Sequence, residues 1–398
     1  MNPTLATLCG VSAIALVASS SAARITLDLD YSLDTNSFFN SGTANGQLAR
    51  ATLERAADTF ADRFLDNLTA VGDAPVTFAP DLLNDWTPTV THPGTGVTSF
   101  VPPGLNAVNA NVIKIFAGGR DLPGTTIGLG GGGGASFSYY EQSWLDNVES
   151  RGQSGVLSTP ATDYAPWGGS ITFDPGITWN LGLANPASGQ NDFLSVALHE
   201  LGHLLGVGGD SFQALISGST FTGPKSTAAH GGTVTIADGG HLSALNSTVT
   251  GTDSQGIAMS PSITVGSRKR LTLLDWAVLD DLGWDLARPG DANADATVNF
   301  ADLVRLAQNY NQSGTSISWS EGDFNYDLTV NFADLVALAR NYNTTGALSL
   351  TAAETANLGA SFTQDWALAQ TLVPEPSVLM AAGALMLVGF RRSRPTAR

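Results

Sequence analysis

Apolar and polar residues alternate in the first part of the chain in a way that predicts short strands. Residues 25–31 alternate at period two, which is typical of a half-buried strand. Residues 111–117 and 169–174 are short, largely apolar runs, and we predict a strand for each. Residues 71–110 are rich in Pro, Gly and Thr, so we expect mostly loop there, with one or two short strands.

Three longer segments carry apolar residues at helical spacing. Residues 46–69 predict a scaffold helix, and residues 195–207 predict a buried helix that Asp192 caps at its N-terminus. Residues 271–283 predict an amphipathic helix that ends at a glycine. Strand, long helix, strands and a central helix in this order indicate an α+β fold.

A glycine run occupies residues 128–135. A phosphate-binding loop is the alternative, but neither a helix nor a Lys-Ser/Thr pair follows the run. We therefore expect a mobile loop near the cleft.

The central helix carries the residues of a zinc site. His199 and His203 are four positions apart, so at about 100° per residue they project from one helix face. With Glu200 they form the H-E-x-x-H motif of zinc peptidases, in which the carboxylate is the general base toward a water molecule at the metal. A chance match is the alternative. Because four of the five histidines lie between positions 199 and 241, the zinc site is favoured.

Length, charge and cysteine content limit the possible classes. The chain has 398 residues, 43% of them hydrophobic, which suits one domain of enzyme size with small appendages. A formal net charge of -17 argues against nucleic acid or an anionic membrane as a partner. Residues 1–23 resemble a secretory signal peptide, although no Lys or Arg precedes Arg24. If the leader is cleaved there, the only cysteine, Cys9, is lost, so neither a disulfide nor thiolate latency is expected.

The stretch 24–285 resembles the metzincin clan of zinc peptidases. The resemblance implies a twisted mixed sheet backed by two helices, the second of which carries the zinc motif. Residues 256–261 resemble the Met-turn that lies beneath the zinc site in this clan. Their Met259 is the only methionine between the leader and the C-terminal tail, although a single methionine is also a common core filler.

The third zinc ligand does not stand at its usual place. The common metzincin pattern matches at Gly206, but Gly209 occupies the position of the third histidine. The sequence resembles leishmanolysin-like members in this respect, where an insertion carries that ligand further along. Asp210, His230 and His241 are the candidates. We favour His241, because it lies closest before the Met-turn and follows two glycines.

A twelve-residue pattern occurs twice after position 288. Oxygen-bearing side chains at loop positions 1, 3, 5, 9 and 12, with the carbonyl of position 7, are the ligands that calcium needs. The predicted calcium ligands are Asp291, Asn293, Asp295, Thr297, Asn299 and Asp302 in the first loop, and Asp323, Asn325, Asp327, Thr329, Asn331 and Asp334 in the second. Residues 289–345 resemble a type I dockerin, a small α-helical calcium-loop module that docks on cohesin domains.

Several positions depart from the dockerin pattern. Positions 10 and 11 are Phe-Ala in both loops, and position 6 is Ala296 or Leu328 where glycine is usual. Calcium binding is compatible with these departures, whereas a cohesin-like partner stays an open alternative.

The C-terminal residues predict a linker followed by a signal for sorting the protein to the cell surface. We expect residues 346–372 to be a weakly structured linker. Residues 373–398 hold a Val-Pro-Glu-Pro segment, an apolar run and a cluster of arginines, and they resemble the PEP-CTERM tail that exosortase-type systems recognise in Gram-negative bacteria. At about 1.5 Å per residue the run extends roughly 20 Å, less than the bilayer core of about 30 Å. A transient anchor is therefore favoured over an ordinary tail anchor.

These features together predict a secreted or surface-sorted zinc metalloendopeptidase that hydrolyses protein or peptide substrates, with a calcium-binding module. The alternative is a non-catalytic, calcium-stabilised surface adhesion or matrix protein on a metzincin scaffold. The intact Glu200 argues against this alternative, since a structural zinc site needs no base.

Overall fold

A computed structural model describes residues 24–72, 76–79, 82–250, 254–342, 358 and 360–372. The predicted signal peptide (1–23) and sorting signal (373–398) lie outside the described residues. Within the described part of the chain, no helix combines the length and apolar character that crossing a membrane requires.

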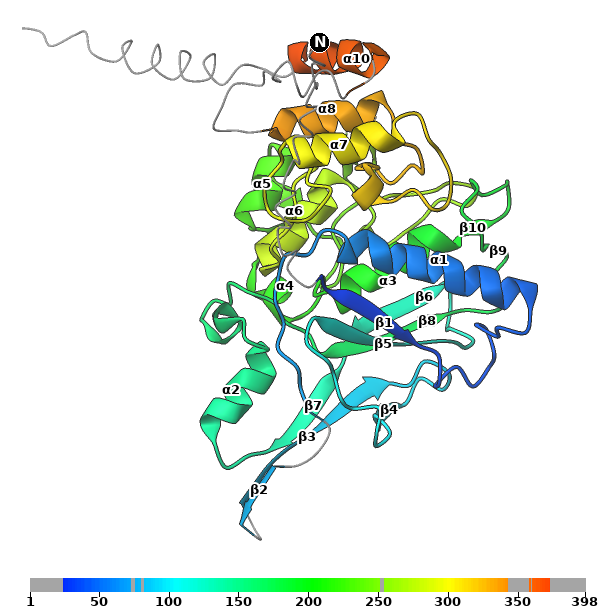
Figure 1. The fold of residues 1–398 in the computed structure, drawn as a ribbon. Helices are drawn as coiled ribbons and strands as arrows, with labels where there is room; N and C mark the ends of the chain where they lie inside the picture. The colour runs from blue at the N-terminus through cyan, green and yellow to red at the C-terminus, as the bar shows by residue number, and fades with distance from the viewer. Residues whose placement is uncertain are drawn as a thin grey trace, which may run out of the picture.

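A four-stranded mixed sheet of order β1-β5-β8-β6 organises the first domain. Strands β1 (Thr26–Asp30), β5 (Val112–Gly119) and β8 (Gly168–Phe173) are parallel, which confirms the three predicted strands. Strand β6 (Gly128–Gly132) runs antiparallel to β8 at the edge of this sheet. Helices α1 (Ala44–Ala61) and α3 (Phe193–Leu204) lie side by side on one face of the sheet (Figure 1).

Helix α1 ends earlier than predicted. Thr43 caps its first turn, but the helix ends at Ala61, so residues 62–69 lie outside it. The Arg63 guanidinium donates hydrogen bonds to the carbonyl of Ala287, and Phe64 forms a bridge with Leu286. This segment is therefore held by contacts with the far end of the domain, which outweigh its helical spacing.

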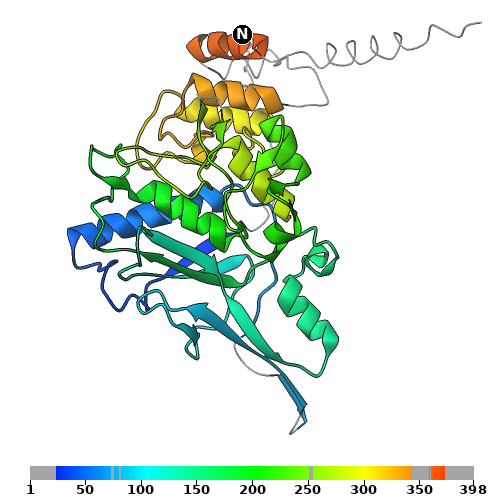
Figure 2. The same cartoon turned by 180° about the vertical axis from the view of Figure 1, so that it is seen from behind.

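A second sheet has three strands within residues 71–110, where we expected mostly loop with one or two short strands. Strand β3 (Leu82–Thr91) pairs with β2 (Val76–Ala79), β4 (Thr98–Phe100) and β7 (Gly134–Ser138). The burial of β3 alternates at period two, but its inward positions include an asparagine and a proline. The segment has one strand more than predicted, and β3 is longer than the short strands expected, because these residues hide the alternation from an apolar count. Figure 2 shows this second sheet from behind, extending away from α1 and α3.

Shorter elements complete the first domain. They are α2 (Gln142–Ser150), a 3-10 helix (Ser154–Leu157), β9 (Trp179–Asn180), β10 (Asn191–Asp192), α4 (Asp210–Ala214), β11 (Ile216–Ser217), β12 (Thr220–Phe221), α5 (Pro224–His230), β13 (Val234–Thr235), β14 (Asn246–Thr248), β15 (Ser254–Gly256) and α6 (Leu273–Leu282). Helix α6 confirms a helix that ends at the predicted glycine, Gly283, with a left-handed φ of 107°. Its polar and apolar residues are not separated as predicted, because Asp275 is buried and Leu273 is exposed.

A small helical module follows, with its own buried core. It contains α7 (Phe300–Asn309), a 3-10 helix (Trp319–Glu321), α8 (Phe332–Asn341) and α10 (Ala360–Thr371). Helix α10 packs on α8 (Figure 1), and its Phe362 and Trp366 are buried. The prediction of a weakly structured linker was therefore wrong for α10. The apolar side chains recur there at helical spacing, within a composition of Ala, Thr and Ser that obscured them.

Candidate metal centre

Helix α3 presents the predicted zinc motif. Its N-cap Asp192 accepts a hydrogen bond from the Ser195 backbone N–H at 3.1 Å, which confirms the predicted cap. Most of its apolar side chains are fully buried, so the helix is held rigidly against the sheet. The helix ends at Leu204, where Gly206 turns the chain with a φ of 114°.

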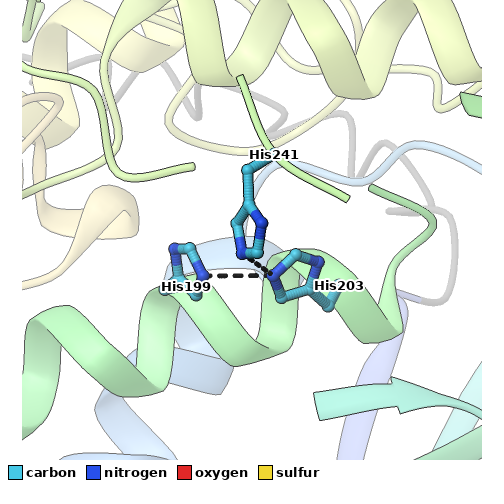
Figure 3. A group of neighbouring side chains, drawn as sticks. All are labelled: His199, His203 and His241. Atoms are coloured by element: carbon cyan, nitrogen blue, oxygen red, sulfur yellow. Dashed lines mark hydrogen bonds between the residues drawn. The ribbon is translucent and has the colours of Figure 1, made fainter. Parts of the chain in front are cut away.

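Three imidazoles meet above this helix. His203 Nε2 lies 3.1 Å from His199 Nε2 and 3.2 Å from His241 Nε2 (Figure 3). In the described part of the chain, these three residues form the group of His, Cys, Asp or Glu side chains whose ligand atoms all lie within 4.8 Å of one another. His241 comes from a segment distant in sequence, which a backbone hydrogen bond from Leu242 to Met259 (3.1 Å) holds in place.

The hydrogen bonds of the three Nδ1 atoms determine which nitrogen of each imidazole is free to bind a metal. His199 Nδ1 lies 2.8 Å from the Ala258 carbonyl, and His203 Nδ1 lies 2.9 Å from the Val207 carbonyl. His241 Nδ1 lies 2.9 Å from the carboxylate of Asp238. Each of these oxygen acceptors requires a proton on Nδ1, so the Nε2 atom of each neutral ring carries a lone pair. The three Nε2 lone pairs point at one another, and a cation between them would satisfy all three.

The donor set fits zinc. With Zn–N bonds of about 2.0–2.1 Å, tetrahedral ligand atoms lie roughly 3.3 Å apart, close to the separations found here. Burial lowers the pKa of His199 to about 3 and also lowers the pKa of His203. Both rings are therefore neutral at physiological pH, the form that binds a metal.

The other two candidates for the third ligand lie elsewhere. Asp210 begins helix α4, and His230 is the last residue of α5. Neither belongs to the histidine group that the described residues form.

Glu200 lies beside the histidines and against the glycine run. Its side chain is buried, and burial raises the pKa of Glu200 to about 8, although a hydrogen bond from the Gly130 backbone opposes this shift. A Cβ atom at Gly128 would lie 2.5 Å from Glu200 Oε1, and a Cβ at Gly130 would lie 2.1 Å from the Glu200 backbone oxygen. The expected mobile loop is thus wrong: residues 128–132 form edge strand β6, and glycine is needed at Gly128 and Gly130 because the backbone approaches α3 so closely there.

Met259 is buried directly beneath α3. A Cβ atom added at Gly202 would lie only 2.5 Å from Met259 Sδ. The carboxylate of Asp275 accepts hydrogen bonds from the backbone N–H groups of Ala258 and Met259, each at 3.0 Å, and it also completes a capping box with Thr272. Sequence reasoning missed Asp275, although the Thr-x-x-Asp spacing at the start of α6 was a visible signal.

A cavity of about 630 Å³ opens onto the histidines and Glu200. Strand β6 borders one side, and the segment after Met259 borders the other. Apolar lining comes from Val196 and Ile263. Lys269, which sequence reasoning also missed, anchors that segment because its Nζ donates to Ile257 O at 3.0 Å and to Ser260 Oγ at 2.7 Å.

The two predicted calcium loops share one internal geometry. Asp302 accepts the backbone N–H groups of Ala292 (2.9 Å) and Asn299 (2.8 Å). Asp334 accepts the corresponding groups of the second loop at 2.8 Å and 3.0 Å. Burial raises the pKa of Asp302 to about 6 and the pKa of Asp334 to about 8, with neighbouring carboxylates adding to the shift. Such a group of carboxylates fits a bound cation.

Position 6 of each loop adopts the conformation for which glycine is usual. Ala296 and Leu328 both have a φ of 67°, in the left-handed region. The departures from glycine therefore preserve the shape of the loop, at the cost of backbone strain.

Two protein-family models match this chain, one over the histidine site and one over the two loops. Residues 134–230 match the family model of matrixins. The match includes His199, Glu200 and His203 but ends before His241 and Met259. Residues 289–343 match the type I dockerin domain. No curated protein and no solved structure matches the chain significantly.

Proposed function

We propose that this protein is a zinc-dependent metalloendopeptidase with a calcium-binding dockerin module. The observation that carries the proposal is the convergence of three imidazole Nε2 atoms beside the buried carboxylate of Glu200, at the mouth of a cavity. His199, His203 and His241 would hold the zinc. The chemistry that zinc supplies when bound is polarisation of the scissile carbonyl and a lowered pKa of a water molecule.

Glu200 handles the protons of the reaction. In its ionised form, which the positive charge of a bound zinc would favour, its carboxylate accepts a proton from the attacking water and delivers it to the leaving amine. The hydrogen bond from Gly130 orients this carboxylate, and Gly128 packs closely against it. Glu200 is therefore held in one position between α3 and β6.

Strand β6 positions the substrate. In the described sheet, β6 is an edge strand that pairs with β8 alone and borders the cavity. An extended peptide can add to such an edge through main-chain hydrogen bonds, which suits substrates recognised along their backbone. The cavity next to His199 then receives one substrate side chain.

Met259 and its turn correspond to the Met-turn beneath the zinc site. The third ligand, His241, stands further along the chain than in the common pattern, which makes the site leishmanolysin-like. His241 lies 38 residues after His203, as an insertion before the last ligand requires. Export through the inner membrane, sorting by an exosortase-type system and display on the surface of a Gram-negative-type cell complete the proposal. A cohesin-like domain is the partner that the dockerin module suggests.

Hydrolysis of casein by the purified full-length protein tests this function. We expect activity that a zinc chelator removes and added zinc restores. Glu200→Gln should keep its zinc and lose activity by a factor of about 10² to 10⁴, because the amide preserves the shape but accepts no proton. Glu149→Gln, at an exposed position on α2, serves as the matched control. Full activity of Glu200→Gln, or zinc binding without any hydrolysis in the wild type, would contradict the proposal and favour a non-catalytic adhesion protein.

A further inference from the structure

The two calcium loops carry the same predicted ligand side chains but lie in different surroundings. In the first loop, Asp295 and Thr297 are exposed to solvent. At the equivalent positions of the second loop, Asp327 and Thr329 are half-buried, and Asn325 is completely buried, with 0% exposure. The pair thus forms an internal comparison in which ligand chemistry is constant and the environment varies.

The peptidase domain covers the second loop through three polar contacts. Arg55 on α1 forms an ion pair with Asp323 (3.4 Å), whose side chain is 0% exposed. One turn further along α1, the Thr59 carbonyl accepts a hydrogen bond from the Tyr326 hydroxyl at 2.9 Å. Arg270 donates to the Asn325 carbonyl at 3.1 Å.

The first loop makes a much weaker connection to the peptidase domain. The Ala292 carbonyl accepts a hydrogen bond of 3.3 Å from Arg24, whose side chain is 34% exposed. Asp291, the counterpart of Asp323, has its backbone carbonyl bonded to Trp319 inside the module. The peptidase domain therefore makes more contacts with the second loop, whereas residues 295–297 of the first loop face solvent.

The contacts between the peptidase domain and the second loop involve residues at or next to the predicted calcium ligands. Asp323 Oδ2 accepts the Leu328 backbone N–H and also faces Arg55, while Oδ1 accepts the Asp327 N–H. Asn325 offers its backbone carbonyl to Arg270, and Tyr326 stands between two ligand positions. Because calcium orders the side chains at positions 1, 3 and 5, it also orders the groups that touch α1 and Arg270.

We propose that the second calcium loop is the surface by which the dockerin module docks on helix α1 of its own peptidase domain, so that calcium at this loop, and not at the first, stabilises α1. The inference rests on the proposed calcium binding. Because α1 packs beside the zinc helix, docking extends the influence of calcium to the scaffold of the peptidase site. Linkage requires that docking and calcium binding at the second loop strengthen each other.

Hydrogen exchange of the full-length, zinc-loaded protein, followed by mass spectrometry with calcium or with a calcium-selective chelator, tests the proposal. Two variants form a matched pair, Asp323→Ala in the second loop and Asp291→Ala at the same position of the first. In the wild type and in Asp291→Ala, calcium should slow exchange in α1 (Ala44–Ala61) by about tenfold, whereas in Asp323→Ala it should leave α1 unchanged.

A second pair keeps every calcium ligand and so guards against simple misfolding of the module. Arg55→Ala should retain calcium protection of the second loop but lose most of the protection of α1, while Arg305→Ala, at an exposed position on α7, should behave as the wild type. Equal effects of Asp291→Ala and Asp323→Ala on α1 would overturn the docking proposal. So would calcium protection of both loops without any change in α1. If calcium protected neither loop from exchange, both the docking proposal and the calcium binding on which it rests would be overturned.

Discussion

The Nδ1 atom of His241 lies 2.9 Å from an Oδ1 atom of Asp238, three positions earlier in the chain. Asp238 also accepts the Gly240 backbone N–H at 2.8 Å, so the carboxylate holds both the ring and the turn that carries it. Of the three imidazoles, His241 is the one whose Nδ1 partner is a carboxylate, because His199 and His203 use backbone carbonyls. The orientation of His241 therefore depends on one side chain.

We predict that Asp238→Ala weakens zinc binding by about 10- to 100-fold, the usual effect of removing a hydrogen-bond partner behind a metal ligand. Competition with a fluorescent zinc chelator measures the change. Asp174→Ala, which removes a carboxylate outside the histidine group, provides the comparison. An unchanged zinc affinity in Asp238→Ala would show that the turn holds His241 without this carboxylate.

The identity of the third ligand can be decided by zinc content. We expect His241→Ala to lose bound zinc and activity together, because a catalytic site needs three protein ligands. His230→Ala and Asp210→Ala should keep both, since neither residue lies in the histidine group that the described chain forms. Elemental analysis after dialysis is the measurement. Zinc retained in His241→Ala but lost in Asp210→Ala would assign a His-His-Asp site instead.

Two adjacent glycines of β6 should respond differently to alanine. A Cβ atom at Gly130 would lie 2.1 Å from the Glu200 backbone oxygen, whereas a Cβ at Gly131 would have no neighbour within 4 Å. We expect Gly130→Ala to lower the free energy of unfolding by about 1–3 kcal/mol, because backbone must move. Gly131→Ala should change it by less than about 1 kcal/mol. Denaturant titration of both variants checks this, and equal effects would contradict the close approach of β6 to α3.

Asp66 should make stability fall as pH rises. Burial, together with the nearby Asp285 carboxylate, raises the pKa of Asp66 from 3.8 to about 7. The folded protein therefore binds one more proton than the unfolded chain between these values. The contribution of Asp66 is fully present below about pH 4 and is lost as pH rises through about 7.

The variant Asp66→Asn lacks this titration. We predict that its free energy of unfolding, relative to that of the wild type, rises between pH 5 and pH 8. Denaturant unfolding of both proteins at the two pH values gives the comparison. A relative stability that is independent of pH would show that Asp66 ionises alike in the folded and unfolded states.

The sequence by itself determined the features that depend on neighbours within a turn or a short loop. His199 and His203 face the same way because they are four positions apart on one helix. Asp192 caps that helix by accepting a hydrogen bond from the backbone N–H of Ser195, three positions later. The calcium loops are likewise local, since Asp302 and Asp334 each accept N–H groups from their own twelve-residue segment. Such patterns can be recognised before any fold is known.

The tertiary structure decided what depends on segments far apart in the chain. The approach of His241 to His203 spans 38 residues, and periodicity carries no information about which distant loop reaches the helix. The glycine run suggested a mobile loop, and only the close approach of α3 to Gly128 and Gly130 shows why no side chain fits at these two positions. Asp291 and Asp323 are equivalent in sequence, and only the packing of Arg55 against Asp323 makes them different. Close packing between distant segments is set by the whole fold, because each contact requires all the others to be in place.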